Sequence, residues 1–188
     1  SVLRDLGHIA DAALRGREIV RKLLLFARQT PASKRPTEIN PVVEEALFLL
    51  EAGCENPGIR FIRELGSGLP RIEADPLQIR QVITNLVINA MQSIETSGTV
   101  TVITASDGDM VALTVSDTGA GMSEDVQRRL FDPFFTTKDV GDGTGLGLSI
   151  VQGIVAEHAG TIGVQSEHGG GSTFRVLLPA SGGTGAAP

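Results

Sequence analysis

The sequence predicts an α/β protein with two layers, in which helices cover one face of a mixed, mainly antiparallel sheet. One long N-terminal helix is expected to precede these layers. Two observations support this prediction: β-branched runs joined by short glycine-containing turns, which are typical of hairpins, and longer segments with helical periodicity between them. Helices on one face of such a sheet bury its apolar side.

The first element expected is a helix over residues 3–28. Apolar residues recur seven apart, as in a helix that packs in a bundle with another segment or chain: Leu6, Ala13, Val20 and Ala27. The alternative is a surface helix that packs on its own domain. Residues 30–38 contain Pro31 and Pro36 and are predicted to form a linker.

Within the α/β domain, helices are expected at 40–52, 76–94, 123–130 and 146–158. Asn40 is the predicted N-cap of the first of these helices, and Asp75 precedes Pro76 at the start of the second. Strands are expected at 59–65, 71–74, 100–105, 110–116, 161–166 and 172–178.

The predicted domain organisation follows from these elements. Residues 1–30 form a helical segment, 31–39 a linker, 40–179 the α/β domain, and 180–188 a Gly/Ala-rich tail that is expected to be disordered.

Composition excludes several classes of protein. The net charge of −6, from 16 basic and 22 acidic residues, argues against a nucleic-acid partner. Cys54 is the single cysteine, which rules out an internal disulfide and suits a reducing compartment. The sequence has neither an 18-residue apolar run nor a visible signal peptide, so a cytoplasmic location is expected, with a membrane anchor elsewhere in the full-length protein left open.

Two asparagines, Asn85 and Asn89, lie four residues apart on the helix that follows Asp75, so their side chains share one face. In an otherwise apolar stretch, each amide needs a partner. One interpretation is two core amides bonded to local backbone. The other is that Asn89 supplies a neutral oxygen to Mg²⁺, which prefers hard oxygen ligands.

Asp117 ends an apolar strand and is followed by Gly119 and Gly121. A carboxylate at this point can accept a hydrogen bond from an exocyclic amine such as that of adenine, and glycines let the backbone approach a flat base closely. An Asp-Thr-Gly turn without a ligand is the alternative.

A second glycine-rich stretch, Gly143, Gly145 and Gly147, precedes the helix expected from Leu146. The free N–H groups of a first helical turn bind anions, and Lys138 upstream can bring positive charge to phosphates. Phe131, Phe134 and Phe135 are predicted to anchor this segment, although ordinary core packing would also explain them. The Thr173 hydroxyl is expected to reach the base pocket, unless Thr173 is simply a strand residue.

Together these motifs resemble the ATP-binding catalytic domain of sensor histidine kinases over about residues 5–179, and look most like the nitrogen-regulation and oxygen-sensing branch. Asn85–Ala90 resembles the N box, Asp117–Gly121 the G1 box, Phe131–Phe135 the F box, Gly143–Gly147 the G2 box, and Gly169–Phe174 the final glycine motif. The resemblance implies a Bergerat-type sandwich that binds ATP and Mg²⁺ under a lid at about 122–144.

The resemblance also implies roles for individual residues. Asn89 would hold Mg²⁺, and Asn85, Asn89 and Lys138 would be catalytic. The implied nucleotide contacts are Asn85, Asn89, Asp117, Gly119, Gly121, Met122, Phe131, Lys138, Gly143, Thr144, Gly145, Leu146, Gly147, Leu148 and Thr173. The γ-phosphoryl group would pass to a histidine and then to the aspartate of a response-regulator receiver domain, and the full-length protein would be a homodimer.

Two departures from the family pattern shape the prediction. His8 lacks the acidic residue and proline that follow the acceptor histidine, so the acceptor is expected on a dimerisation helix absent from this chain. Gln92 stands where many relatives carry lysine, which makes phosphate contact from that position doubtful.

Three functions are possible for this chain, and Asn85 distinguishes the first two. Related hydrolysing ATPases of the gyrase, Hsp90 and MutL group carry a general-base glutamate at the matching position, and an amide cannot accept that proton. Asn85 therefore favours a kinase over a hydrolysing ATPase module. A binding module without catalysis is the third possibility, disfavoured by the intact glycine motifs and Asn89.

Overall fold

The computed structural model describes residues 32–137 and 144–181. The elements, in chain order, are β1 (Arg35–Thr37), α2 (Ile39–Ala52), β2 (Ile59–Leu65), β3 (Ile72–Ala74), α3 (Pro76–Ser93), β4 (Gly98–Asp107), β5 (Met110–Asp117), α4 (Glu124–Arg129), α5 (Gly147–Glu157), β6 (Thr161–Glu167) and β7 (Gly171–Pro179). The helix expected over 3–28 lies outside the described residues, as do the tail from 182 and the segment 138–143.

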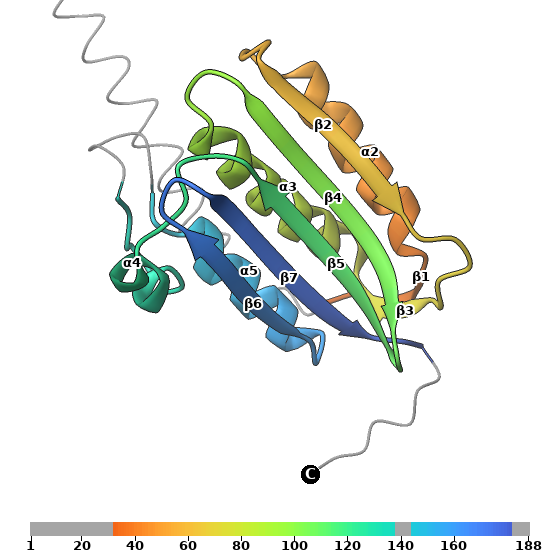
Figure 1. Cartoon of the computed structure of the whole chain (residues 1–188). Coiled ribbons are helices and arrows are strands. Elements are labelled where there is room, and N and C mark those ends of the chain that lie inside the picture. The colour runs from red at the N-terminus through yellow and green to blue at the C-terminus, as the bar shows by residue number, and fades with distance from the viewer. Residues whose placement is uncertain (1–31, 138–143, 182–188) are drawn as a thin grey trace, which may run out of the picture.

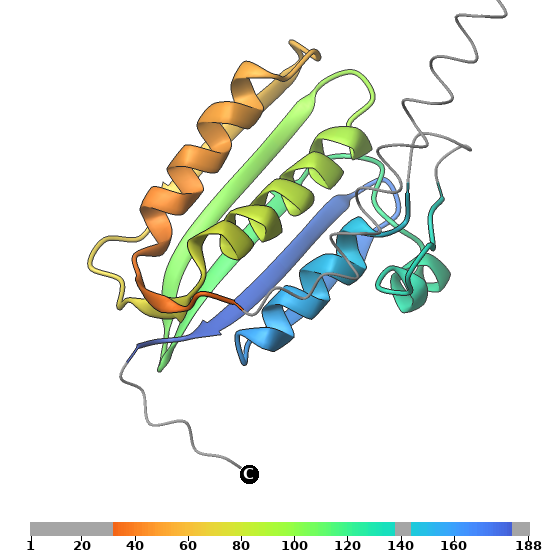
Figure 2. The same cartoon turned by 180° about the vertical axis from the view of Figure 1, so that it is seen from behind.

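Five strands form the main sheet in the order β2-β4-β5-β7-β6. The β2–β4 pair is parallel and the other three pairs are antiparallel. Helices α2, α3 and α5 lie side by side on one face of this sheet (Figures 1 and 2). The predicted two-layer arrangement with a mixed, mainly antiparallel sheet is confirmed.

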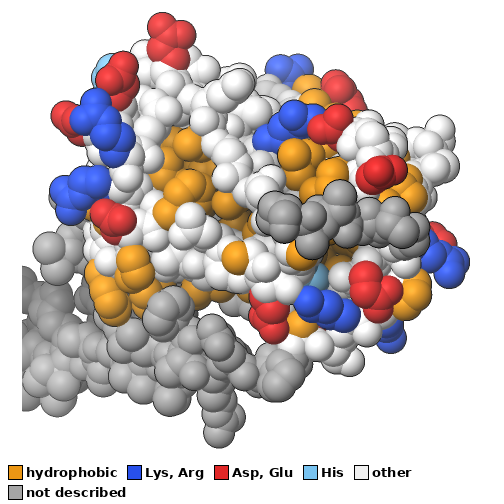
Figure 3. Space-filling model, turned by 90° about the horizontal axis from the view of Figure 1, so that it is seen from below, with side chains coloured by type: hydrophobic (Ala, Val, Ile, Leu, Met, Phe, Trp, Pro, Cys, Tyr) orange, Lys and Arg blue, Asp and Glu red, His pale blue; other side chains and the backbone are white. Residues whose placement is uncertain are grey.

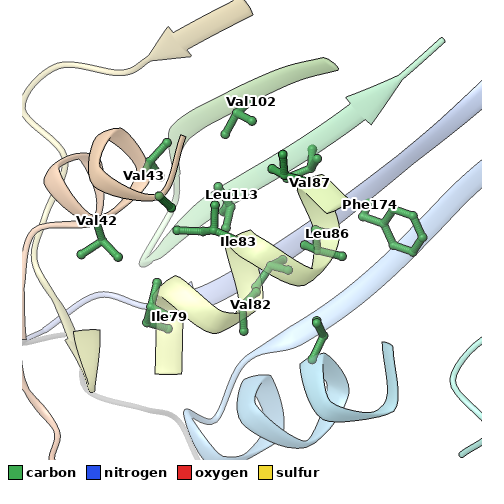
Figure 4. Close-up of a cluster of buried hydrophobic side chains, with 14 of the residues drawn as sticks. Val42, Val43, Ile79, Val82, Ile83, Leu86, Val87, Val102, Leu113 and Phe174 are labelled. Carbon is green, nitrogen blue, oxygen red and sulfur yellow. The ribbon is translucent and has the colours of Figure 1, made fainter. Parts of the chain in front are cut away.

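Helix α3 is the central element of the core. Its buried residues recur at helical spacing: Ile79, Val82, Ile83, Leu86, Val87 and Ala90. Figure 4 labels five of these side chains, all except Ala90, in one buried cluster with Val102, Leu113 and Phe174. This burial fixes which face of α3 points to the sheet, and therefore which residues of α3 remain for other contacts.

The end of the predicted linker is an ordered part of the domain. Residues 35–37 form β1, which pairs antiparallel with β3 in a separate two-stranded sheet. Just before β1, the backbone N–H of Ser33 donates to Asp75 Oδ2 (2.9 Å), and that of Ala32 donates to Glu157 Oε1 (3.2 Å). The sequence Arg-Pro-Thr of β1 is not typical of a strand. The strand is therefore explained by its pairing with β3.

Asp75 caps α3 as predicted, since its Oδ1 accepts from the N–H of Leu77 (2.9 Å). The same residue is tied to α5, because its backbone N–H donates to Nε2 of buried His158 (3.1 Å). The start of α3 and the end of α5 are therefore joined, and both are also bonded to the segment just before β1.

The prediction that Asn40 caps α2 is wrong. The helix begins one residue earlier, at Ile39, and its N-cap Glu38 makes no side-chain capping bond. Asn40 instead lies in the first turn, where its Nδ2 donates to the Gly66 carbonyl (2.8 Å) and its Oδ1 accepts from Thr104 Oγ1 (2.7 Å). Thr104 is buried and its oxygen accepts from the Gly66 N–H (3.1 Å), so Asn40 supplies the acceptor for the Thr104 hydroxyl proton.

Charges on the molecular surface are mixed in sign. On the described part of the face shown in Figure 3, acidic and basic side chains lie interspersed among apolar and uncharged ones. Across the described residues, ion pairs join different elements, including Arg80 with Glu45 (2.7 Å) and Arg63 with Glu51 (2.7 Å). Such partly exposed pairs contribute little stability, so the fold depends mainly on the core around α3.

We expect the substitution Asn40→Ala to lower the free energy of unfolding by about 1–3 kcal/mol, because it leaves the proton of the buried Thr104 hydroxyl without its acceptor and the Gly66 carbonyl without its donor. Urea unfolding followed by circular dichroism measures the change. Glu44→Ala, an exposed change on the same helix, is the matched control and should shift stability by less than about 0.5 kcal/mol. Equal effects of the two changes would contradict the role given to Asn40.

Candidate functional site

Three polar residues of α3 lie along one side of the helix. Asn85, Asn89 and Ser93 are spaced four apart and are all half-buried, so they follow one another along the helix axis. The Nδ2 of Asn85 is buried and has no hydrogen-bond partner among the described residues. A buried donor without an acceptor is costly, and it would be satisfied by an anionic oxygen of a ligand.

Asn85 faces the start of α5. A Cβ atom added at Gly147, the first residue of α5, would lie 3.9 Å from Asn85 Oδ1. The N-cap residue Leu146 supplies no side-chain hydrogen bond to the first turn of α5. The free N–H groups of this turn and the Asn85 amide therefore form a donor-rich region suited to phosphate.

Asp117 lies at the other end of the row of polar residues. It is 8% exposed, and its Oδ1 accepts from Ser93 Oγ (2.9 Å) and from the N–H of Gly119 (2.8 Å). Burial raises the pKa of this carboxyl, while the Gly119 N–H, the Ser93 hydroxyl and the Ser172 N–H oppose that rise. Asp117 is thus a carboxyl group held in a fixed orientation at the end of β5.

The glycines after β5 are required by close backbone packing. A Cβ at Gly119 would overlap Ser93 Oγ. Gly121 has φ +65°, and a Cβ there would overlap the carbonyl of Glu167. The Ala120 N–H donates to the Ser93 carbonyl (3.0 Å), which ties this loop to the last turn of α3.

The second glycine-rich stretch is held against the phenylalanine segment. Gly145 has φ +63°, and its carbonyl accepts from the N–H of Phe134 (2.9 Å). A Cβ at Gly145 would overlap the Phe134 backbone. The segments before and after residues 138–143, which are not described, are therefore in contact at Phe134 and Gly145.

Only part of the predicted aromatic anchoring is seen. Phe131 is half-buried against the core, and the Phe135 ring lies under the Arg129 guanidinium, 4.4 Å from its centroid. Phe134 is 62% exposed, so its predicted role as an anchor is wrong. Its φ of +68° and its backbone bond to Gly145 explain why this residue serves the turn and not the core.

The remaining predicted contacts are placed as follows. Met122 lies in the loop after β5, and its N–H donates to Ser166 Oγ (2.8 Å). Leu146 is buried, while Thr144 and Leu148 are half-buried around the start of α5. Lys138 and Gly143 lie outside the described residues.

The structure places Thr173 away from this site, which corrects its predicted position. The β5–β7 register pairs Asp117 with Ser172 and Ser116 with Thr173, and successive strand residues point to opposite faces. The Thr173 hydroxyl accordingly bonds to Ser116 Oγ (2.9 Å), while Ser172 is buried on the helix side beside Ser166 Oγ (2.9 Å).

Sequence reasoning thus missed Ser172 and Ser93. The alternation of Phe174, Val176 and Leu178 along β7 would have assigned Ser172 to the buried face. The four-residue spacing from Asn89 would have pointed to Ser93.

Comparison with known proteins shows the protein family to which the chain belongs. Residues 74–182 match the family model described as "Histidine kinase-, DNA gyrase B-, and HSP90-like ATPase", and the chain belongs to this family. Among its branches, the chain carries an ATP-binding domain of the histidine kinase type. It is 36% identical to the sensor histidine kinase ZraS of Escherichia coli (strain K12), over 92% of this chain and 37% of that protein.

A second relative is the sensor protein FixL of Bradyrhizobium diazoefficiens, which is 39% identical over 94% of this chain and 35% of its own length. The chain therefore spans little more than a third of these two curated relatives.

Solved structures agree with this assignment. Full-length ShkA in complex with AMPPNP superposes with a TM-score of 0.80 at 32% identity, covering 96% of this chain and 38% of ShkA. The nucleotide-free catalytic domain of histidine kinase ThkA gives 0.71 at 32% identity, covering 79% of this chain and 96% of that domain. In the part of the chain that the structure describes, no helix is long and apolar enough to cross a membrane.

The raised pKa of Asp117 predicts how stability depends on pH. The carboxyl favours folding most below its ordinary pKa of 3.8, and that contribution is lost as the pH rises through the higher pKa of the folded state. Asp117→Asn cannot ionise. The free energy of unfolding of the native chain, minus that of the variant, should therefore fall as the pH rises above roughly 4 and level off once the pH exceeds the raised pKa of the folded state. Urea unfolding at a series of pH values measures this difference, and a difference that grows with pH would contradict the assignment.

Proposed function

We propose that this chain is the catalytic core of a sensor histidine kinase, which binds Mg·ATP and transfers the γ-phosphoryl group to a histidine. The acceptor lies on a dimerisation helix absent from this chain. The observation that supports this most is the row Asn85, Asn89 and Ser93 on α3, which runs from the start of α5 to the buried carboxyl of Asp117. The AMPPNP in the similar ShkA structure supports a nucleotide as the ligand.

The two ends of this row suit the two ends of ATP. At one end, the Asp117 carboxylate accepts a hydrogen bond from the exocyclic amine of adenine. At the other end, the free N–H groups at the start of α5 and the Asn85 Nδ2 donate to phosphate oxygens. Lys138 and the Gly143–Gly147 backbone add further contacts to the phosphates.

Mg²⁺ fits this donor set only together with the nucleotide. Asn89 offers one neutral amide oxygen, and the described residues contain no group of three His, Cys, Asp or Glu side chains that could hold a metal by themselves. Sites that bind Mg²⁺ through few protein ligands complete its coordination with phosphate oxygens and water. When bound, the ion neutralises charge on the phosphates.

The residues around the phosphates position the reactants and provide no base. Phosphoryl transfer depends mainly on alignment and charge neutralisation. Asn85 holds the place where a carboxylate would activate water, and its amide cannot take that proton. The site is therefore built to keep the phosphoryl group for a histidine, and hydrolysis is expected to be slow.

The partners follow from the same reaction. ThkA in complex with the response regulator TrrA is similar to this chain, with a TM-score of 0.77 at 26% identity, over 96% of this chain and 52% of ThkA. A receiver domain is accordingly the proposed final acceptor here. We further propose a homodimeric full-length protein whose catalytic part is cytoplasmic, with residues 122–144 as the lid over the nucleotide.

We expect Asn89→Ala to remove most of the Mg²⁺-dependent part of ATP affinity, because the substitution deletes the proposed metal ligand. Calorimetric titration with ATP in the presence of Mg²⁺ and of EDTA measures that part. Asn56→Ala is the matched control, since Asn56 Oδ1 accepts from the Gly58 N–H in the turn before β2 and Asn56 is not among the proposed nucleotide contacts. An unchanged Mg²⁺ dependence in the Asn89 variant would refute the metal role.

The function itself is tested by phosphoryl transfer in trans. We expect the chain, given Mg·ATP labelled on the γ-phosphate, to label a separately supplied dimerisation hairpin that carries the acceptor histidine. The label should be acid-labile, and His8 should stay unlabelled. Rapid steady release of inorganic phosphate without labelling of the hairpin would instead indicate a hydrolysing ATPase.

A further inference from the structure

We infer that Ser93 is a specificity-determining positioning residue: it occupies one oxygen of the Asp117 carboxylate, so that the carboxylate can read the single exocyclic amine of adenine and not the paired donors of guanine. This inference rests on the proposed function, because it concerns how that same site selects its nucleotide.

The geometry fills one carboxylate oxygen completely. Oδ1 of Asp117 accepts from Ser93 Oγ at 2.9 Å and from the Gly119 N–H at 2.8 Å. A carboxylate oxygen has two lone-pair positions, so these two donors use both. The accepting capacity that remains is that of the other oxygen, less what the Ser172 N–H uses, since that N–H also hydrogen-bonds the carboxylate.

Ser93 has one proton and two acceptors within reach, since its Oγ also lies 2.8 Å from the Ala90 carbonyl. When Asp117 is ionised, the charge-assisted bond to the carboxylate is the stronger of the two. When the Asp117 carboxylate accepts a hydrogen bond from a base, the Ser93 hydroxyl therefore donates to that carboxylate and not to the Ala90 carbonyl.

Ser93 is held in place from two sides. Its carbonyl accepts from the Ala120 N–H at 3.0 Å, and Gly119 packs against its hydroxyl so closely that a Cβ would overlap Oγ. As part of the last turn of α3, it is also fixed by the buried face of that helix. The hydroxyl is thus pre-organised, and the orientation of the carboxylate follows from it.

The chemistry of the bases explains the consequence for selectivity. Adenine offers one exocyclic amine, and its neighbouring ring nitrogen is an acceptor. Guanine offers a ring N–H beside its exocyclic amine, and this pair of donors matches a carboxylate only when both oxygens are available. With Oδ1 occupied, guanine would leave a buried donor unpaired, which is the kind of mismatch that produces strong discrimination.

The experiment compares Mg·ATP and Mg·GTP affinities by calorimetric titration for the native chain, Ser93→Ala and Ser116→Ala. Ser116 is the matched control: it precedes Asp117, but its hydroxyl bonds to Thr173 on the other face of the sheet. We expect Ser93→Ala to narrow the ATP-over-GTP affinity ratio by about tenfold, the scale of a hydrogen bond to a charged group. Ser116→Ala should leave the ratio unchanged.

A role of Ser93 in packing alone would lower both affinities by the same factor and leave the ratio unchanged, which would overturn the inference while the proposed function stands. Binding of neither nucleotide by the native chain would instead defeat the proposed function. If Ser93→Ala fails to give the native circular dichroism spectrum, Ser93→Gly removes the same hydroxyl, and its ratio must narrow in the same way.

Discussion

The bonds between the last turn of α3 and the loop after β5 connect the two layers of the domain at the site. Ser93 contributes both its hydroxyl, to Asp117, and its carbonyl, to Ala120. Gly119 makes this close approach possible, since any larger residue would collide with Ser93. The carboxyl of Asp117 is consequently positioned by the helix as much as by its own strand. Separating these elements would remove the base end of the site while most of the sheet stayed intact.

Helix α3 serves the core and the site with different faces. Its apolar residues pack on the sheet, and this burial supplies much of the driving force for folding. The remaining side carries Asn85 and Asn89, whose amides are polar groups in a half-buried setting. The buried Nδ2 of Asn85 has no partner within residues 32–137 and 144–181, and a phosphate oxygen would relieve the cost of that unpaired donor. Functional sites commonly carry such costs.

The sequence was sufficient to predict the layers, the order of the elements and the position of Asp117 at a strand end, because those features follow from local periodicity and turn residues. It failed where tertiary contacts decide. Asparagine is a residue type that favours the N-cap position, yet Asn40 lies inside the first turn of α2, where its side chain accepts from the buried Thr104 hydroxyl. The apolar alternation of Phe174, Val176 and Leu178 already places Ser172, and not Thr173, on the buried face, and the register with β5 brings Ser172 beside Asp117. The spacing of Ser93 from Asn89 indicates a shared helix side, but its bond to Asp117 depends on the tertiary packing of α3 against the loop after β5.

The central claim is that α3 lies along a nucleotide with the base at Asp117 and the phosphates at Asn89 and the start of α5. A crystal structure of this chain with Mg²⁺ and a non-hydrolysable ATP analogue tests it most directly. We expect the exocyclic amine of adenine within hydrogen-bond distance of Asp117, and the metal bound by the Asn89 amide oxygen. An analogue bound in the reverse direction, or at another surface of the domain, would contradict it.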